Sequence, residues 1–159
     1  MKTSIFTVVL LLALTLPVFP QNKANEESEQ SLKRKDVPKT ILAAFEQSYP
    51  KAKVQGYSKE TDKGKTVYEI ESKEGKTARD VSYNEDGSLV SVEESIQYSE
   101  LPETVRGAIA KEYPKHKAVI CEKIMKGTTT EFEVLLKSGK QKIEVVYNPD
   151  GSVVEKETK

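Results

Sequence analysis

The sequence predicts an α+β fold with two tandem repeats, each a helix followed by four antiparallel strands, and with the helices packed on one face of the sheet. Three observations lead to this prediction. The second half of the chain resembles the first at a constant offset, which aligns Val37 with Leu101. Each half begins with a short segment in which apolar residues recur at helical spacing. Each half then continues with short runs of alternating apolar and polar residues, separated by turns, which are typical of strands.

The internal repeat determines the domain organisation. Residues 37–93 and 101–157 align without a gap, and 21 of the 57 aligned positions are identical. Such identity within one chain indicates a duplicated structural unit. We therefore place the first repeat at residues 36–96 and the second at residues 97–159.

Each repeat is expected to begin with a helix of about 11 residues, which is too short to be stable unless it packs on the rest of the fold. Pro38 and Pro102 suit the first helical turn, where a missing N–H group costs nothing. Each helix should end at a Tyr-Pro pair, because the residue before proline disfavours helical angles. The apolar stripes comprise Ile41, Leu42, Phe45 and Tyr49 in the first copy and Val105, Ala108, Ile109 and Tyr113 in the second.

The remainder of each repeat is expected to form an antiparallel meander of four strands. The expected strands are residues 53–59, 66–73, 77–84 and 88–94 in the first copy and 117–125, 130–137, 141–148 and 152–157 in the second. Gly75 and Gly139 should lie in tight hairpin turns. Gly87 and Gly151 lie in matching Asp-Gly-Ser turns, where we predict that both glycines have positive φ.

Alternation along these strands assigns the side chains to two faces of the sheet. The face that the helices should cover carries Tyr68, Ile70, Val81, Tyr83, Val90 and Val92, and in the second copy Phe132, Val134, Ile143, Val145, Tyr147 and Val154. The opposite face is expected to carry Tyr57, Val67, Glu69, Glu71, Asp80 and Ser82, and in the second copy Val119, Cys121, Glu131, Glu133, Leu135, Glu144 and Val146. If the two meanders join edge to edge, this opposite face becomes one broad surface with many carboxylates and scattered apolar groups.

The amino terminus has the pattern of a secretory signal peptide, which we place at residues 1–21. Lys2 precedes an apolar run of about 12 residues, whereas a membrane-spanning helix needs about 20. A retained anchor or a buried helix is the alternative. Residues 22–35 are dominated by charge and are expected to form a disordered spacer, with a docking tail as the alternative. The mature protein is thus expected to be periplasmic or secreted, with no membrane span after signal cleavage.

The composition excludes several classes of function. Lys and Arg number 25, and Asp and Glu also number 25, which excludes a polybasic nucleic-acid binder. Cys121 and His116 are the single cysteine and the single histidine, so they cannot form an internal disulfide or a Cys/His zinc site. We interpret His116 as a solvated loop residue and Cys121 as a partly covered strand residue, with a redox or intermolecular disulfide site as the alternative for Cys121.

Catalysis and metal binding have little support in the sequence. The chain has no phosphate-binding loop, no nucleophile elbow and no His-Glu zinc motif. The acids around Asp86 and Asp150 are too sparse for a calcium loop. We therefore expect no enzymatic activity, no cofactor and no metal site.

The motifs shared by the two copies resemble a known family. The shared string is V/L-P-x-x-I/V, then Y-P-K-x-K, then Y/F-E-I/V, then Y-N-x-D-G-S. It is similar to the PepSY-like repeat proteins of the bacterial envelope, whose fold is related to β-lactamase inhibitor protein. The resemblance covers about residues 37–157. It implies a single layer of sheet backed by helices, in an exported protein without a characterised enzymatic activity.

The same resemblance suggests what such a protein does. An inhibitory role toward peptidases has been supposed for PepSY domains, and β-lactamase inhibitor protein uses its open sheet surface against an enzyme. That inhibitor has disulfides which this chain cannot form, so only the fold is carried over, and not the target.

Two classes of function remain. The first is a non-catalytic, protein-binding or inhibitor-like module that binds an envelope protein, such as a peptidase or another enzyme, through the open sheet face. The alternative is a periplasmic carrier that holds a small ligand, peptide or cation in the groove between the repeats. A merely solvated face is the simplest reading of the acid-rich surface. The candidate partner-binding residues are Tyr57, Val67, Glu69, Glu71, Val119, Glu131, Glu133 and Leu135.

Overall fold

Residues 28–62 and 65–159 are described by the structure, which is a computed structural model. Within these residues, nine strands form one antiparallel sheet in which the strands follow one another in sequence order. The strands are β1 (Ser28–Ser31), β2 (Lys53–Asp62), β3 (Lys65–Glu74), β4 (Thr77–Asn84), β5 (Leu89–Ser95), β6 (Lys117–Lys126), β7 (Thr129–Ser138), β8 (Gln141–Tyr147) and β9 (Val153–Thr158). The helices are α1 (Lys39–Ser48) and α2 (Glu103–Glu112), together with the 3-10 helices η1 (Arg34–Asp36) and η2 (Tyr98–Glu100).

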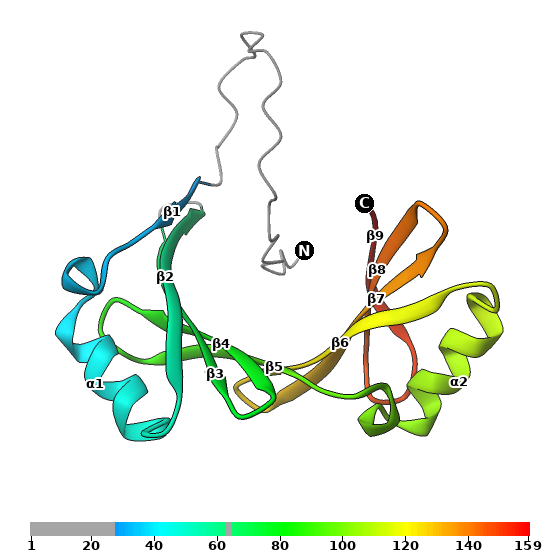
Figure 1. The fold of residues 1–159 in the computed structure, drawn as a ribbon, viewed down its shortest axis with the longest axis horizontal. Helices are drawn as coiled ribbons and strands as arrows, with labels where there is room; N and C mark the ends of the chain where they lie inside the picture. Colours follow the sequence, from blue (N-terminus) through cyan, green and yellow to red (C-terminus); the bar gives the residue numbers. More distant parts are fainter. Residues whose placement is uncertain (1–27, 63–64) are drawn as a thin grey trace, which may run out of the picture.

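The sheet is curved, and the two α-helices lie on its outer side. Its two ends, β1–β2 and β8–β9, rise on either side of the middle strands, and α1 and α2 lie against the outer side of opposite ends (Figure 1). Neither α-helix lies on the inner side, which carries Glu69, Glu93 and Glu133. We call this inner side the open face.

Each helix packs on its own cluster of strand side chains. Ile41 of α1 and Val105 of α2 are fully buried at the centres of these clusters. Burial of one such side chain stabilises the fold by about 1.5–3 kcal/mol. The first cluster is Val37, Ile41, Phe45, Ile70, Val81, Tyr83 and Val92. The second is Leu101, Val105, Ile109, Tyr113, Cys121, Phe132, Val134, Leu136, Ile143, Val145 and Tyr147.

The two repeats join through β5 and β6. Four residue pairs form this junction, from Val92 opposite Met125 to Ser95 opposite Glu122. Met125 of the second repeat packs against the first cluster, and Ile96 packs against the second. The junction therefore makes the sheet and its open face continuous from β1 to β9.

The ends of the two helices agree with the sequence prediction, whereas residues 28–35 are ordered and were predicted to be disordered. Both helices end directly before a tyrosine, Tyr49 or Tyr113, as predicted. The expectation of a disordered spacer is wrong for residues 28–35, since β1 pairs with β2 and Leu32 packs against the first cluster. Backbone pairing on an available sheet edge needs no apolar side chains, so composition did not reveal it. The expected signal peptide, with residues 22–27, lies outside the described residues.

Four β-bulges change the phase of the strands. Gln55 in β2 and Val119 in β6 have no cross-strand partner on β3 or β7. Val90 and Val154 are likewise extra residues on β5 and β9. Each pair is related by the repeat offset, so the duplication preserved the bulges. Val90 and Val154, which we expected on the helix-covered face, belong to neither core cluster, and Val154 is 37% exposed.

The Asp-Gly-Ser turns connect the sheet to the helices. Gly87 and Gly151 have φ values of 86° and 87°, which confirms the predicted positive φ. Asp86 Oδ1 accepts hydrogen bonds from the Ser88 backbone N–H and hydroxyl, and Asp150 does the same with Ser152. The hydroxyls of Thr40 and Thr104 donate to carbonyl oxygens in these turns, Glu85 O and Pro149 O. Each turn thus fixes the first helical residues of its own repeat against the strand ends.

No helix in the described part of the chain is long and apolar enough to cross a membrane.

Candidate functional site

The open face carries acidic side chains on every strand from β3 to β9. Strand pairing places Glu71, Asp80 and Glu93 directly opposite one another on β3, β4 and β5. On the other side of the junction, Glu122 of β6 lies opposite Glu133 of β7, and Glu144 of β8 lies opposite Glu157 of β9. Like charges at such positions repel, so this arrangement costs stability in the free protein.

Three of these acids recur in both repeats. Glu69, Asp80 and Glu93, which we call the first trio, occupy the positions of Glu133, Glu144 and Glu157, the second trio, at the repeat offset. In each trio, the last two residues are direct cross-strand partners. The first member lies one diagonal step away, since Glu69 is opposite Ser82 and Glu133 is opposite Val146. The two repeats therefore share the spatial arrangement of these three acids, and not only a high content of acidic residues.

Burial makes these carboxylates weak acids. Desolvation, with the nearby charge of Asp80, raises the pKa of Glu69 to about 8. Desolvation and Glu144 raise the pKa of Glu133 to about 8. Desolvation likewise raises the pKa of Glu93 to about 7 and that of Asp80 to about 6, and it raises the pKa of Glu122. Several open-face carboxyls therefore hold a proton near neutral pH, which limits the repulsion between them.

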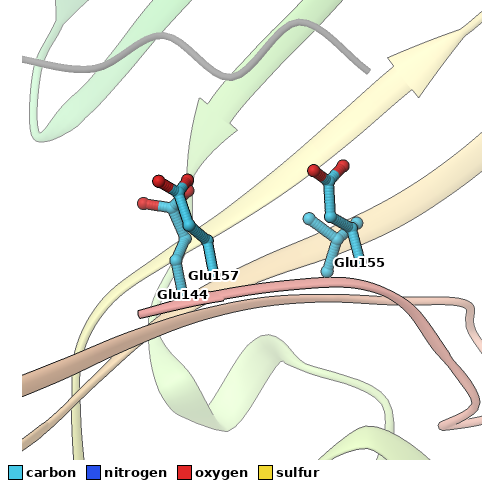
Figure 2. A pocket seen from close by; sticks show the side chains of 4 residues that line it. Glu144, Glu155 and Glu157 are labelled. Carbon is cyan, nitrogen blue, oxygen red and sulfur yellow. The ribbon is translucent and has the colours of Figure 1, made fainter. Parts of the chain in front are cut away.

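The second trio has a cation of its own. Lys159 Nζ lies 2.7 Å from Glu157 Oε2 and 3.4 Å from Glu144 Oε1. Its charge also lowers the pKa of Glu133 against the opposing effects of burial and neighbouring acids. The side chains of Glu144 and Glu157 point the same way, whereas Glu155 stands apart from them (Figure 2). With Val146, these three acids line a shallow depression on the open face.

The first trio has no such partner among the described residues. Glu69 is only 8% exposed, and its Oε1 atom is buried without a hydrogen bond. Within residues 28–62 and 65–159, none of the charges that shift the pKa of Glu69 or Asp80 is positive. Glu93 is near the charge of Lys126, but no ion pair joins the two in the part of the chain that the structure describes. A buried carboxyl oxygen without a hydrogen-bond partner is energetically costly.

Most apolar residues of the open face belong to the second repeat, and Val67 of β3 is the exception. Ile120, Ile124, Leu135 and Val146 lie on this face by their pairing. The equivalent positions in the first repeat are Gly56, Glu60, Glu71 and Ser82. Ile120 is 47% exposed, whereas Ile124 and Val146 are buried although they belong to neither core cluster. The open face is thus polar at one end and partly apolar at the other.

Six of the eight candidate partner-binding residues lie on the open face: Val67, Glu69, Glu71, Glu131, Glu133 and Leu135. Tyr57 does not, since it pairs with Ile70 and packs against the first core cluster. Val119 is the bulged residue of β6 and is 51% exposed. Because it has no cross-strand partner, the alternation of side chains along β6 assigns it to neither face.

Cys121 is also on the helix side, opposite Val134 in the second core, so its placement on the opposite face is wrong. The reason is the same for Tyr57 and Cys121. The bulges at Gln55 and Val119 insert one residue, and an insertion of one residue reverses the face of every residue that follows. Sequence reasoning also missed Glu93, Glu122 and Ile120. The recurrence of Glu93 as Glu157 at the repeat offset was the available signal for the first of these.

The remaining reactive side chains do not form a site. His116 follows α2, and its ring is nearly perpendicular to that of Tyr113. Its Nε2 atom is buried, so the expectation of a solvated residue is wrong. Cys121 is buried in the core. Within residues 28–62 and 65–159, no group of three His, Cys, Asp or Glu side chains has a spacing that could hold a metal ion.

The buried thiol leads to a simple prediction. Burial, together with Glu122, raises the pKa of the Cys121 thiol, so little thiolate is available near neutral pH. We expect a disulfide reagent that absorbs on reaction to modify the native protein at least about a hundredfold more slowly than the protein unfolded in guanidinium chloride. Equal rates in the two states would show that this strand opens readily.

Comparison with known proteins agrees with this architecture. The family model described as "Putative beta-lactamase-inhibitor-like, PepSY-like" matches residues 21–91 and 68–155. No curated protein matches the chain in sequence. A DUF2874 family protein from Bacteroides uniformis has a TM-score of 0.65 and 17% identity, and the match covers 76% of this chain and 88% of that one.

Two further structures have the same fold. A "putative periplasmic" protein from Bacteroides eggerthii has a TM-score of 0.66 and 17% identity, covering 77% of this chain and 88% of that one. A BLIP-like protein from Bacteroides fragilis has a TM-score of 0.60 and 18% identity, covering 76% of this chain and 86% of that one. Identities this low establish similarity of fold alone. The match to the family model extends over most of the sequence, and the chain therefore belongs to the PepSY-like, beta-lactamase-inhibitor-like family.

Proposed function

We propose that this protein is an exported, non-catalytic module of the periplasm that binds a protein partner through the open face of its sheet. The signal-like pattern of residues 1–21 supports export. The description of the Bacteroides eggerthii neighbour as periplasmic is consistent with that location. The observation that carries the proposal is the open face, which is continuous across β1 to β9 and is not covered by either α-helix.

The chemistry of this face suits a basic protein surface. Carboxylates spread over seven strands attract a positively charged partner from a distance, and salt screens that attraction. Ile120 and Leu135, which are direct cross-strand partners, supply apolar contacts next to the acids. Apolar contacts that lose water on binding hold a complex together, whereas exposed charges chiefly increase its rate of formation.

The positions of the reactive residues support a non-catalytic role. Nucleophilic catalysis requires a thiol or hydroxyl within hydrogen-bonding reach of a base. Cys121 is buried in the second core, and His116 lies in the loop that follows α2. The depression at Glu144 and Glu157 is shallow and encloses little, so it does not favour a carrier of small ligands.

Charge reversal on the open face tests the proposal. The immobilised mature protein is used to capture proteins from envelope extract, and captured proteins are identified by mass spectrometry. We expect the Glu69→Lys, Glu133→Lys double variant to lose the specific partner, because both positions lie in the acidic part of the open face. Its stability near pH 8, where Glu69 and Glu133 are partly ionised in the wild type, should be equal to that of the wild type or slightly greater, since each change removes like-charge repulsion.

The matched control carries the same change in net charge elsewhere. Glu85 and Glu112 are exposed, in the β4–β5 turn and at the end of α2. A Glu85→Lys, Glu112→Lys variant should retain the partner. Unaltered affinity of the open-face variant at low salt, or equal losses in both variants, would place the binding site elsewhere.

A further inference from the structure

The second repeat contains an ammonium group bound among its acids. The backbone N–H of Lys159 donates to the Lys142 carbonyl oxygen, which continues the pairing of β9 with β8. From this position the Lys159 side chain reaches Glu157 and Glu144, at 2.7 Å and 3.4 Å. A charge-assisted hydrogen bond and a second carboxylate nearby are the usual surroundings of a lysine ammonium.

The first repeat has the same acids without the ammonium. The residue equivalent to Lys159 at the repeat offset is Ser95. Ser95 Oγ accepts a hydrogen bond from the Ala78 backbone N–H, at 2.8 Å. This hydroxyl brings no charge to the trio.

The surroundings of Glu69 are a second observation that the first trio lacks a counter-charge in the described part of the chain. Glu69 is more than nine-tenths buried, and its Oε1 atom lacks any hydrogen bond within the described structure. The described groups whose charges shift the pKa of Glu69 are all acidic. Three lie on other strands, Glu29 on β1, Asp80 on β4 and Glu93 on β5, and Glu71 lies on its own strand. Among the described residues, the cation whose charge affects this trio is Lys126 on β6, which acts on Glu93.

We propose that the first trio, Glu69, Asp80 and Glu93, is a binding site for the ammonium group of a lysine side chain on the partner protein. That ammonium would take the place that Lys159 occupies among the second trio. This inference rests on the proposed function, since it names the group by which the partner is recognised at the open face.

The chemistry of the trio favours a primary ammonium over other cations. An ammonium has three N–H donors, which suit carboxylates that converge from adjacent strands. A quaternary ammonium has the same charge but no donor, so it cannot satisfy the buried Oε1 atom of Glu69. Because the carboxyls hold protons in the free protein, binding of the ammonium releases protons to the solvent, and binding therefore strengthens as the pH rises toward 8.

The site is tested with a lysine analogue in place of the unidentified partner. N-acetyl-lysine N-methylamide is titrated into the ¹⁵N-labelled protein near pH 8, and amide shifts are followed by NMR. We expect saturable shifts around residues 69, 80 and 93, with a Kd on the order of 1–10 mM, and none around residues 133, 144 and 157. Tetramethylammonium chloride at the same concentration should not reproduce them.

Two variants make use of the internal repeat. Ser95→Lys places an ammonium on the chain itself at the position equivalent to Lys159, so it should abolish the shifts around the first trio. Lys159→Ser removes the internal ammonium and should produce new shifts around the second trio. The amide spectrum of each variant reports in the same experiment whether the fold is intact.

Several outcomes would overturn the inference. They are the absence of first-trio shifts at probe concentrations well above the expected Kd, equal shifts with tetramethylammonium, or unchanged shifts in folded Ser95→Lys protein. These outcomes are separate from failure of the proposed function. If the open-face double variant loses the partner but the lysine analogue causes no shifts, the proposed function stands and the lysine-binding site is refuted.

Discussion

The free energy of unfolding is expected to fall as the pH rises from about 5 to about 8. Glu69 and Glu133 have pKa values of about 8 in the folded protein, against 4.5 for an ordinary glutamate. Between these values the folded protein binds more protons than the unfolded chain, so stability is greatest at the lower pH and is lost as these carboxyls ionise. We expect each of these two carboxyls to contribute a decrease on the order of 3 kcal/mol across this window.

Other carboxyls do not reverse the trend within the window. Hydrogen bonds from the side chains and backbones of Ser88 and Ser152 lower the pKa values of Asp86 and Asp150. These two groups therefore remain ionised above about pH 4 in both the folded and the unfolded state. Asp80 and Glu93 add to the trend, since their pKa values are raised to about 6 and about 7.

Urea unfolding at constant ionic strength measures this dependence. Replacement of both glutamates, in a Glu69→Gln, Glu133→Gln variant, should flatten the profile and raise the stability at pH 8 above that of the wild type. Glu85→Gln, at an exposed turn position, should leave the profile unchanged. A wild-type protein that is more stable at pH 8 than at pH 5 would contradict the burial of these carboxyls.

Replacement of Gly151 by alanine is expected to destabilise the protein by about 2–4 kcal/mol. Its φ of +87° is unfavourable for any residue with a Cβ atom. A Cβ atom at this position would also lie 2.7 Å from the backbone oxygen of Thr104, at the start of α2. Thr104 donates to Pro149 O in the same turn, so relief of the clash would disturb the contact between helix and turn.

Two other glycines provide graded controls for this prediction. Gly127 has a φ of +56°, but a Cβ atom there would contact nothing within 4 Å, so Gly127→Ala should cost only about 1 kcal/mol. Gly87→Ala should be intermediate, because its Cβ atom would lie 3.3 Å from Thr40. Urea midpoints of the three variants test this order. Equal losses at Gly151 and Gly127 would mean that backbone conformation alone, and not the approach of α2, requires glycine.

The predictions that succeeded from sequence rest on short-range signals. The ends of α1 and α2 follow from Tyr-Pro pairs, and the conformations of Gly87 and Gly151 follow from Asp-Gly-Ser turns. In each case a few adjacent residues restrict the backbone through sterics and local hydrogen bonds. The predictions that failed concern strand phase. Tyr57 and Cys121 were assigned to the wrong face because an extra residue at Gln55 or Val119 becomes apparent only when the neighbouring strand is paired.

At the candidate site, too, sequence signals within one strand predicted some features, and pairing between strands decided the others. Alternation along single strands was sufficient to place Glu69, Glu71 and Glu133 on one face. It did not reveal that Glu69 is buried without a hydrogen bond, that Glu93 faces Asp80, or that Lys159 neutralises only the second trio. These properties depend on which residues of different strands meet, and pairing across the β5–β6 junction is not encoded in any one segment.

By itself, the sequence determined that this protein is a duplicated helix-and-meander unit with two acid-rich repeats, because duplication, helix ends and turns are all visible in neighbouring residues. Only the tertiary structure decided which side chains share the open face and which carboxylates lack a counter-charge. Burial, pKa and charge pairing arise from contacts between strands, and those contacts are set by the register and the bulges of the assembled sheet.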